Sequence, residues 1–254
     1  MTKRGRLETG FYGKLPALGD FVSRRLPAEF VQPWDLWLRE SLANSRLQLG
    51  DDWLDIYLTS PLWRFALSPG LVGQAAWAGV MMPSVDRVGR YFPLTLACPL
   101  PSGADLMSLV SESDWFERAE ILALAALDDS CSLDGFDAQV RALGDLQVIR
   151  LANDADSANG LVRTNAWRLP TPATAGSGDV RARLLARALD QMFCGYSLWW
   201  SSGSDRVEPS LLVCQGLPPV DGFSALIGGN WTGHGWWEFA ESTPDRSGGN
   251  EGFS

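Results

Sequence analysis

Apolar side chains in the first sixty residues follow the spacing of helices. Their recurrence at every third or fourth position predicts a helix over 33–49, with Pro33 in its first turn and Gly50 at its end. The positions concerned are Trp34, Trp37, Leu38, Leu42 and Leu49. A second, short helix is predicted after Asp51–Asp52, either of which can cap it, and before Pro61. Its apolar residues are Trp53, Leu54, Ile56, Tyr57 and Leu58.

The pattern then changes to that of strands. Residues 63–67 alternate between large and small or polar side chains, which predicts a strand. Residues 75–82 form an apolar run broken by a single glycine, and its length suits a buried strand. Residues 92–98 predict a third strand, joined to the second by the connection 83–91. The earlier segment 12–21 contains three turn formers and predicts a loop, following a short strand at most.

Helices and strands continue to alternate in the second half. Ser113 or Asp114 can cap a helix whose apolar face reaches Ala126. The remaining predicted elements are helices over 134–143 and 179–192, the latter capped by Asp179, and strands over 146–151, 161–169, 196–201 and 211–215.

This interleaving predicts the fold class. We expect an α/β protein, an α-β-α sandwich in which helices cover both faces of a central mixed sheet. One domain is expected over residues 1–242. The segment 170–178, rich in Pro, Thr, Gly and Ser, is the best candidate for an internal boundary, although a long surface loop explains it equally well. Residues 243–254 are polar and rich in Gly and Ser, which predicts a mobile tail.

Composition narrows the classes of partner. The chain has 254 residues, 46% of them apolar, and a net charge of −9, so a large core is expected and anionic partners such as nucleic acid or an acidic membrane surface are disfavoured. The positively charged N-terminus is not followed by an apolar stretch, and no run is long enough to cross a bilayer. We therefore expect a cytoplasmic protein. The four cysteines have no C-x-x-C spacing and are expected to be buried, reduced thiols.

The sequence contains few residues in patterns that would suit a catalytic or metal-binding site. His234 is the only histidine, so a nucleophilic triad would have to use it and a histidine-based metal site is excluded by number. An all-carboxylate metal site or a carboxylate enzyme stays open, but the adjacent acids Asp51–Asp52 and Asp128–Asp129 are better explained as helix caps or turns. Asp134–Gly135 and Asp221–Gly222 fit turns or caps as well. No phosphate-binding loop is present, and we expect no cofactor.

Twelve tryptophans raise the alternative of a carbohydrate or peptidoglycan-fragment binding module. Most of them fall on core-facing positions of the predicted elements, which favours packing. The pairs Trp199–Trp200 and Trp236–Trp237 are different, because neighbouring residues on a strand point to opposite faces. Each pair is predicted either to span a two-sided core or to expose one ring to a partner.

The chain contains two blocks rich in Gly and Pro, Gly10–Phe21 (GFYGKLPALGDF) and Met82–Thr95 (MPSVDRVGRYFPLT). With Trp34-Asp35-x-Trp37-Leu38, Ser60-Pro61-x-Trp63-Arg64-Phe65 and Ser197-Leu198-Trp199-Trp200, they resemble the TagF family of type VI secretion. The resemblance implies a cytoplasmic, non-enzymatic, post-translational repressor that acts by contact with the forkhead-associated scaffold protein Fha. Some relatives are fused to a PP2C-type phosphatase domain, but neither Asp-Gly pair here continues as Asp-Gly-x-Gly.

The two blocks also supply the candidate site. We expect them to form one partner-binding surface of charged and aromatic residues. The residues chosen are Lys14, Asp20, Phe21, Arg87, Arg90 and Tyr91. The structural alternative is that the glycines supply turn angles and that Asp20 pairs with Arg87 or Arg90 to tie the loops together. Oligomeric state stays open at this point.

Overall fold

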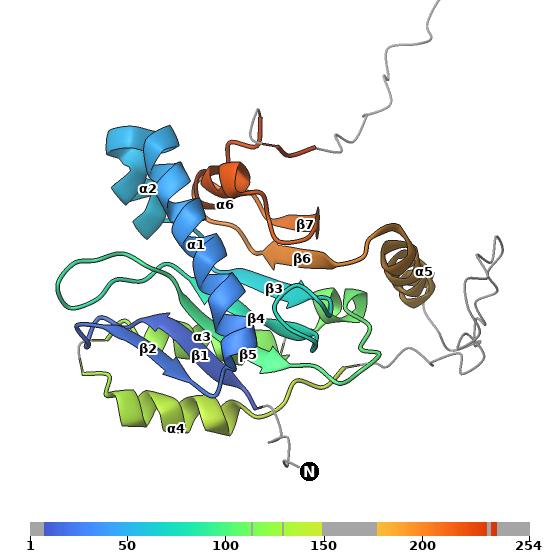
Figure 1. Ribbon diagram of the computed structural model, residues 1–254, viewed down its shortest axis with the longest axis horizontal. Helices are drawn as coiled ribbons and strands as arrows, with labels where there is room; N and C mark the ends of the chain where they lie inside the picture. The colour runs from blue at the N-terminus through green and yellow to red at the C-terminus, as the bar shows by residue number, and fades with distance from the viewer. Residues whose placement is uncertain (1–7, 113, 129, 149–176, 233–234, 238–254) are drawn as a thin grey trace, which may run out of the picture.

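The strands form one open sheet in which every neighbouring pair is antiparallel (Figure 1). The computed structural model describes residues 8–112, 114–128, 130–148, 177–232 and 235–237. Within them the order of strands is β2-β1-β5-β4-β3-β6-β7. The strands are β1 Gly10–Lys14, β2 Phe21–Arg24, β3 Trp63–Leu67, β4 Trp77–Met82, β5 Leu94–Pro99, β6 Tyr196–Ser201 and β7 Ser210–Gln215.

The prediction of a mixed sheet is therefore wrong, and connectivity gives the reason. The connections that contain α-helices, from β2 to β3 and from β5 to β6, join strands that are not neighbours in the sheet. Neighbours that follow one another in sequence, such as β3 and β4, are joined by segments without an α-helix, which permit only antiparallel pairing.

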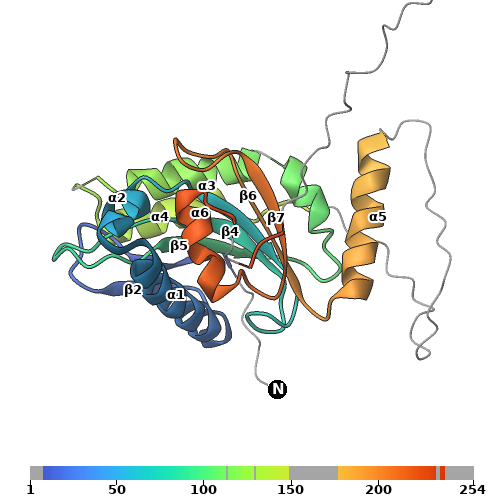
Figure 2. The ribbon, with the colours of Figure 1, turned by 90° about the horizontal axis from the view of Figure 1, so that it is seen from above.

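Helices cover both faces of the sheet, which confirms the predicted α-β-α layers. One face packs against α1 Ala28–Leu49, α2 Trp53–Leu58 and α6 Phe223–Gly228, and the other against α3 Asp114–Ala125 and α4 Leu133–Leu143 (Figure 2). Short 3-10 turns lie at Gly50–Asp52, Met107–Ser111 and Val220–Gly222. The helix α5 Ser177–Met192 lies to one side, where Ala186 and Leu189 join the core on the α3 face. The sequence analysis missed β2 and α6.

Helix α1 begins five residues before the predicted start. The amides of Phe30 and Val31 both donate to the carbonyl of Pro27 at 3.0 Å, which fixes the first turn there. Pro33 consequently lies inside the helix. Its missing N–H would have bonded the carbonyl of Glu29, and Glu29 is exposed, so water can satisfy that carbonyl.

The expected loop at 12–21 is shorter than predicted. Strand β1 continues through Lys14 and β2 begins at Phe21. Gly13 misled the prediction because it is not in a turn. Its φ is 138°, and a Cβ there would lie 2.1 Å from the carbonyl oxygen of Pro93. This glycine allows a close backbone approach inside a strand rather than a chain reversal.

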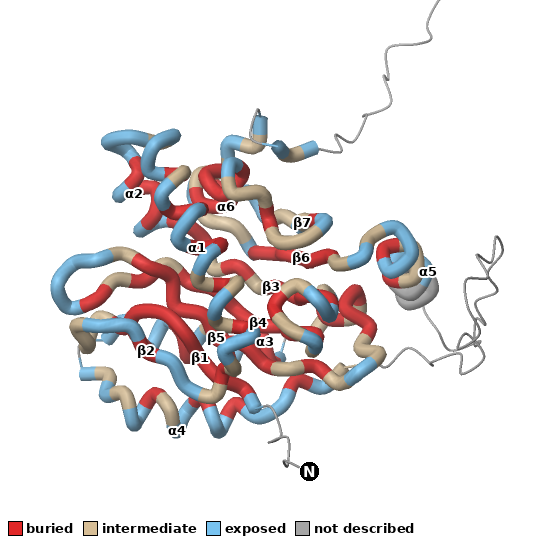
Figure 3. The backbone as a smooth tube through the Cα atoms, viewed as in Figure 1, coloured by how far each residue is buried: buried red, intermediate tan, exposed pale blue. Residues whose placement is uncertain are grey.

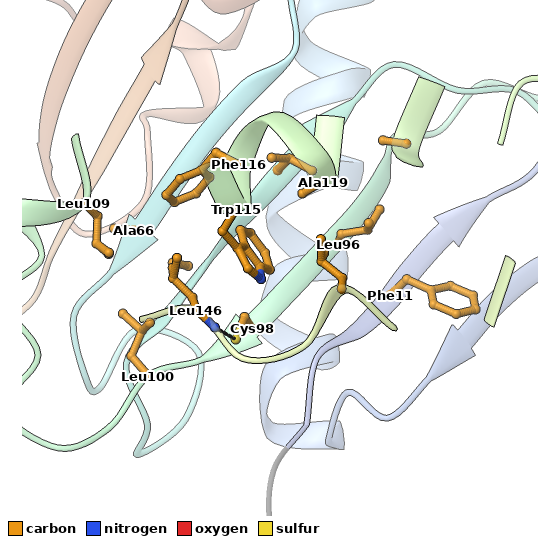
Figure 4. Close-up of a cluster of buried hydrophobic side chains, with 14 of the residues drawn as sticks. Phe11, Ala66, Leu96, Cys98, Leu100, Leu109, Trp115, Phe116, Ala119 and Leu146 are labelled. Atoms are coloured by element: carbon orange, nitrogen blue, oxygen red, sulfur yellow. Dashed lines mark hydrogen bonds between the residues drawn. The ribbon is translucent and has the colours of Figure 1, made fainter. Parts of the chain in front are cut away.

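Other expectations in the second half fail or lie outside the described residues. Residues 146–148 are not part of a strand, and the rest of that predicted strand lies outside the described residues together with 161–169. Leu146 is instead held by its amide, which donates to the sulfur of Cys98 (Figure 4). The candidate boundary at 170–178 is described only at its end, where Ser177 and Gly178 begin α5, two residues ahead of the predicted cap.

The sheet separates two cores, and the central strands β3, β4 and β5 are buried along most of their length (Figure 3). On the α3 face, Phe11, Leu96, Trp115 and Phe116 gather around the strands (Figure 4). On the α1 face the core is aromatic and includes Trp34, Trp37, Phe65, Trp77 and Trp199. Trp199 and Trp200 are both buried, one in each core, so this pair spans a two-sided core and exposes neither ring.

The cysteines divide into accessible and buried thiols. All four are free; Cys98 and Cys214 are buried, Cys131 is half-buried and Cys194 is exposed. The expectation of four buried thiols is thus wrong for two of them. Burial raises the pKa of the Cys214 thiol to about 12, which removes the reactive thiolate at neutral pH.

We therefore expect unequal alkylation of the folded protein. With iodoacetamide at neutral pH, Cys194 should react first, and Cys98 and Cys214 should react about 100-fold or more slowly, because they need local opening of the core. Mass spectrometry of tryptic peptides over time measures each rate. The unfolded protein is the control, in which all four thiols should react alike; equal rates in the folded protein would contradict the assigned burial.

Candidate partner-binding site

The two loops highlighted by the sequence lie together. Residues 15–20 connect β1 to β2, and residues 83–93 connect β4 to β5. The amide of Arg87 donates to the carbonyl of Leu18 at 2.8 Å, and the guanidinium of Arg90 donates to the carbonyl of Gly19. The loops are joined again at their base, where the Ser84 hydroxyl donates to the carbonyl of Lys14 at 2.8 Å. They form one surface region with a shared hydrogen-bond network.

Asp86 is the centre of this network. Its carboxylate is fully buried and lies 2.9 Å from the ammonium of Lys14 and 2.7 Å from Nε of Arg90. It also accepts the backbone amides of Val88 at 3.0 Å and Arg90 at 2.9 Å. Burial alone would raise the pKa of this carboxyl group, but these hydrogen bonds outweigh it and hold the pKa well below its usual range. Asp86 is therefore ionised at neutral pH and fixes both loops.

The acid that ties the loops is thus Asp86 and not Asp20. Asp20 is exposed, and its carboxylate accepts the amide of the next residue, Phe21. Sequence reasoning did not single out Asp86. The available signal was that Asp86 is the only acidic residue between Pro83 and Pro93, in a segment that also carries two arginines.

The six candidate residues lie at different depths. Lys14 is buried beneath the loops, so its ammonium pairs with Asp86 and does not form part of an exposed surface. Asp20, Arg87 and Arg90 are exposed, and Tyr91 is half-buried. Phe21 is 37% exposed and packs edge-on against Phe92 at 4.8 Å.

Val88 was missed by the sequence analysis. It lies between Asp86 and Gly89 at the tip of the loop and is 65% exposed. Gly89 adopts a φ of 81° next to it, and its amide donates to the carbonyl of Asp86 at 2.9 Å, which closes the tip as a tight turn. Val88 is thus an exposed apolar side chain on a turn whose backbone is fixed by hydrogen bonds.

An open cleft of about 580 Å³ adjoins this loop. Its lining residues are Arg46, Gly50, Asp51, Trp53, Leu54, Gly89, Arg90 and Tyr91. The guanidinium of Arg46 lies 4.1 Å from the centre of the Trp53 ring, and the Tyr91 ring lies edge-on to Trp53 at 5.8 Å. Arginine, tryptophan and tyrosine are the residues most enriched in the energetic centres of protein interfaces. The 83–93 loop and this cleft together are called the loop–cleft surface below.

Charge sets this surface apart from the chain as a whole. Arg46, Arg87 and Arg90 contribute three cations, although the chain carries a net charge of −9. The carboxylate of Asp86 offsets one of them from below, and Asp51 lies at the cleft. A partner segment with acidic and apolar side chains would complement this arrangement.

The described residues give no support to a catalytic or metal site. None of them forms a group of His, Cys, Asp and Glu side chains suited to hold a metal ion. Asp51 and Asp52 lie in the 3-10 turn before α2, and the carboxylate of Asp128 accepts the amide of Ser130. His234 and Asp129 lie outside the described residues.

The remaining short motifs have structural roles. Asp134–Gly135 lies in the first turn of α4, where the Ser132 hydroxyl accepts the Gly135 amide, and Asp221–Gly222 lies in a 3-10 turn. Trp236 is half-buried and donates to the carbonyl of Gly222 at 2.9 Å, while Trp237 is 93% exposed. The tryptophan pairs thus supply one strongly exposed ring between them. No helix within the described ranges is both long and apolar enough to cross a membrane.

Comparison with known proteins identifies a family and a similar solved structure. Residues 10–143 match the family model of the TagF N-terminal domain, described as type VI secretion system-associated. Among solved structures, the chain is similar to the crystal structure of PA0076 from Pseudomonas aeruginosa PAO1, with 43% identity and a TM-score of 0.74. That similarity covers 93% of this chain and 98% of the other. No curated protein matches the chain.

Proposed function

The chain belongs to the TagF family of type VI secretion-associated proteins, and on this premise we propose that it represses type VI secretion by binding the scaffold protein Fha through the loop–cleft surface. The repression is post-translational and takes place in the cytoplasm. The chain acts as a single binding module over residues 1–242 and performs no catalysis of its own.

One observation carries the choice of surface: a buried ion pair clamps a loop whose tip is exposed. Asp86 and Lys14 fix the loop from below, and Arg87 and Val88 project from it. A loop that is ordered before binding loses little conformational entropy when a partner docks. A loop held in this way is suited to recognition of a partner.

The chemistry of the surface defines the segment of Fha that would fit. The arginines around the cleft favour a segment bearing carboxylates or a phosphate, and the half-buried Tyr91 ring and the 40% exposed Leu54 favour an apolar residue beside them. Binding of that segment would sequester the scaffold, or compete for it, and keep the secretion machine from assembling. Repression in this scheme is set by the concentrations of the two proteins and their affinity.

A binding experiment with the Fha protein of the same secretion cluster tests the proposal. The purified chain is titrated against phosphorylated and unphosphorylated Fha by isothermal titration calorimetry. Binding to either form supports the proposal, and a difference between the forms identifies the state that is captured. Two folded proteins that do not bind in either state would overturn Fha as the direct partner.

Reversal of the charge at Arg87 should weaken this binding strongly. Arg87 is exposed at the loop tip, so Arg87→Glu is expected to weaken binding to Fha by about 10- to 100-fold, while the free energy of unfolding changes by less than ~0.5 kcal/mol. Arg90 is a less suitable first choice, because its guanidinium also supports the buried Asp86. Calorimetry and urea denaturation measure the two quantities separately.

A matched charge reversal on the other face provides the control. Arg118→Glu lies on α3, where the Arg118 side chain is half exposed, and should leave the affinity for Fha unchanged. If both variants bind like the unaltered protein, the loop tip is not part of the interface. If both lose affinity equally, the effect belongs to net charge and not to this surface.

A further inference from the structure

The two edges of the sheet differ in how well they resist pairing with another strand. The edge strand β2 has four residues and ends at Arg24, followed by Arg25. The opposite edge strand, β7, has six residues and contains no charged residue or proline. Charged residues and short length are the usual protections of a sheet edge, because unpaired backbone groups otherwise recruit further strands. Within the described residues, β7 is the last strand and lacks these protections.

Register shows which backbone groups of β7 face outward. The amide of Gly216 donates to the carbonyl of Gly195 at 2.9 Å, in the same register that pairs Cys214 with Ser197. Hydrogen bonding alternates along an antiparallel strand, so Cys214 and Leu212 also direct their amides and carbonyls to β6. The amides and carbonyls of Leu211 and Val213 therefore point away from the sheet.

The same two residues expose their side chains. Leu211 and Val213 are 45% and 41% exposed. They lie opposite Trp200 and Leu198 of β6, so they continue the apolar face that α3 covers farther into the sheet. Outward backbone groups and exposed apolar side chains thus coincide on two alternate residues of one strand.

We propose that β7 is a self-association surface, on which a second copy of this chain pairs its own β7 in antiparallel orientation about a two-fold axis at Leu212. In this register Leu211 of each copy lies opposite Val213 of the other, on the same face of the joined sheet. The outward amides and carbonyls of both residues are then hydrogen-bonded between the copies. The register places Glu208 opposite Gly216, so no like charges meet, although each chain carries a net charge of −9.

Sedimentation velocity over a range of concentrations tests this proposal. The whole chain should show a reversible monomer–dimer equilibrium in the micromolar range. Val213→Pro removes an outward amide without removing a bond to β6, and should weaken the dimer by about 10-fold or more. Leu211→Lys keeps the backbone but places a charged side chain opposite the apolar Val213 of the other copy, and should weaken the dimer similarly.

A leucine elsewhere on the surface controls for loss of an exposed apolar group. Leu58→Lys, on α2 over the other face of the sheet, removes a 53% exposed leucine and should leave the dimer intact. Circular dichroism establishes that each variant is folded. An unaltered protein that stays monomeric at the highest concentrations overturns the proposal, as does a dimer that both β7 variants leave unchanged.

Discussion

Replacement of Asp86 by alanine is expected to lower the free energy of unfolding by about 3–5 kcal/mol. The substitution leaves the ammonium of Lys14 buried without its counter-charge, and it removes the acceptor of the Val88 and Arg90 amides. Removal of one partner from a buried pair is costly because the other charge stays desolvated. Urea denaturation followed by tryptophan fluorescence measures the change.

Asp20→Ala is the matched control for this variant. Asp20 lies on the adjoining loop but is exposed, so its replacement should change the free energy of unfolding by less than ~0.5 kcal/mol. Lys14→Met should fall between the two, because Asp86 keeps its bonds to Arg90 and to the loop amides. Equal urea midpoints for Asp86→Ala and Asp20→Ala would show that Asp86 does not hold the loops.

Asp86 should also make the free energy of unfolding depend on pH, and the direction of this dependence follows from its pKa. The pKa of Asp86 is lower in the folded protein than the usual value of about 3.9 in an unfolded chain. Its contribution is therefore fully present above that unfolded value and is lost as the pH falls below it toward the folded pKa. The unaltered protein should lose stability more steeply than Asp86→Ala below about pH 4.

The hydrophobic pattern of the sequence predicted several helices and strands correctly. The alternation at Trp63–Leu67 and the apolar run up to Met82 became β3 and β4, because both faces of the sheet are covered by helices. The start of α1 was missed because Pro33 is a common first-turn residue, whereas the turn at Pro27 carries no side-chain cap that a sequence pattern would reveal. Strand directions depend on which strands become neighbours in the sheet, and periodicity along the chain does not encode that order.

The candidate site was predictable in position but not in depth. The two Gly/Pro-rich blocks were expected to meet, and their backbones are hydrogen-bonded to each other. A sequence does not reveal that Lys14 is buried while Arg87 is exposed, because both are cations beside glycines or turn residues. The difference depends on Asp86, which reaches Lys14 across 72 residues of chain and holds its ammonium inside the fold.

A second large loss of stability is expected from replacement of a buried tryptophan. The sequence alone could assign the tryptophans either to the core or to ligand binding. Trp34 is fully buried, and its ring stacks nearly parallel to Trp199 at 5.8 Å. Its indole N–H donates to the hydroxyl of Thr95 at 3.0 Å, which fastens α1 to β5. Because α1 also carries Arg46, this contact positions one wall of the proposed binding cleft.

Trp34→Ala is accordingly expected to lower the free energy of unfolding by about 3–5 kcal/mol, since it leaves a large cavity and an unpaired hydroxyl. Trp34→Phe should lose less, because it keeps a ring against Trp199 and forgoes only the hydrogen bond and part of the volume. Trp237→Ala, which removes a 93% exposed ring, should change the stability by less than ~0.5 kcal/mol. If the order of Trp34→Ala and Trp237→Ala were reversed in urea denaturation, the aromatic core could not be what holds α1 on the sheet, and the cleft would need another support.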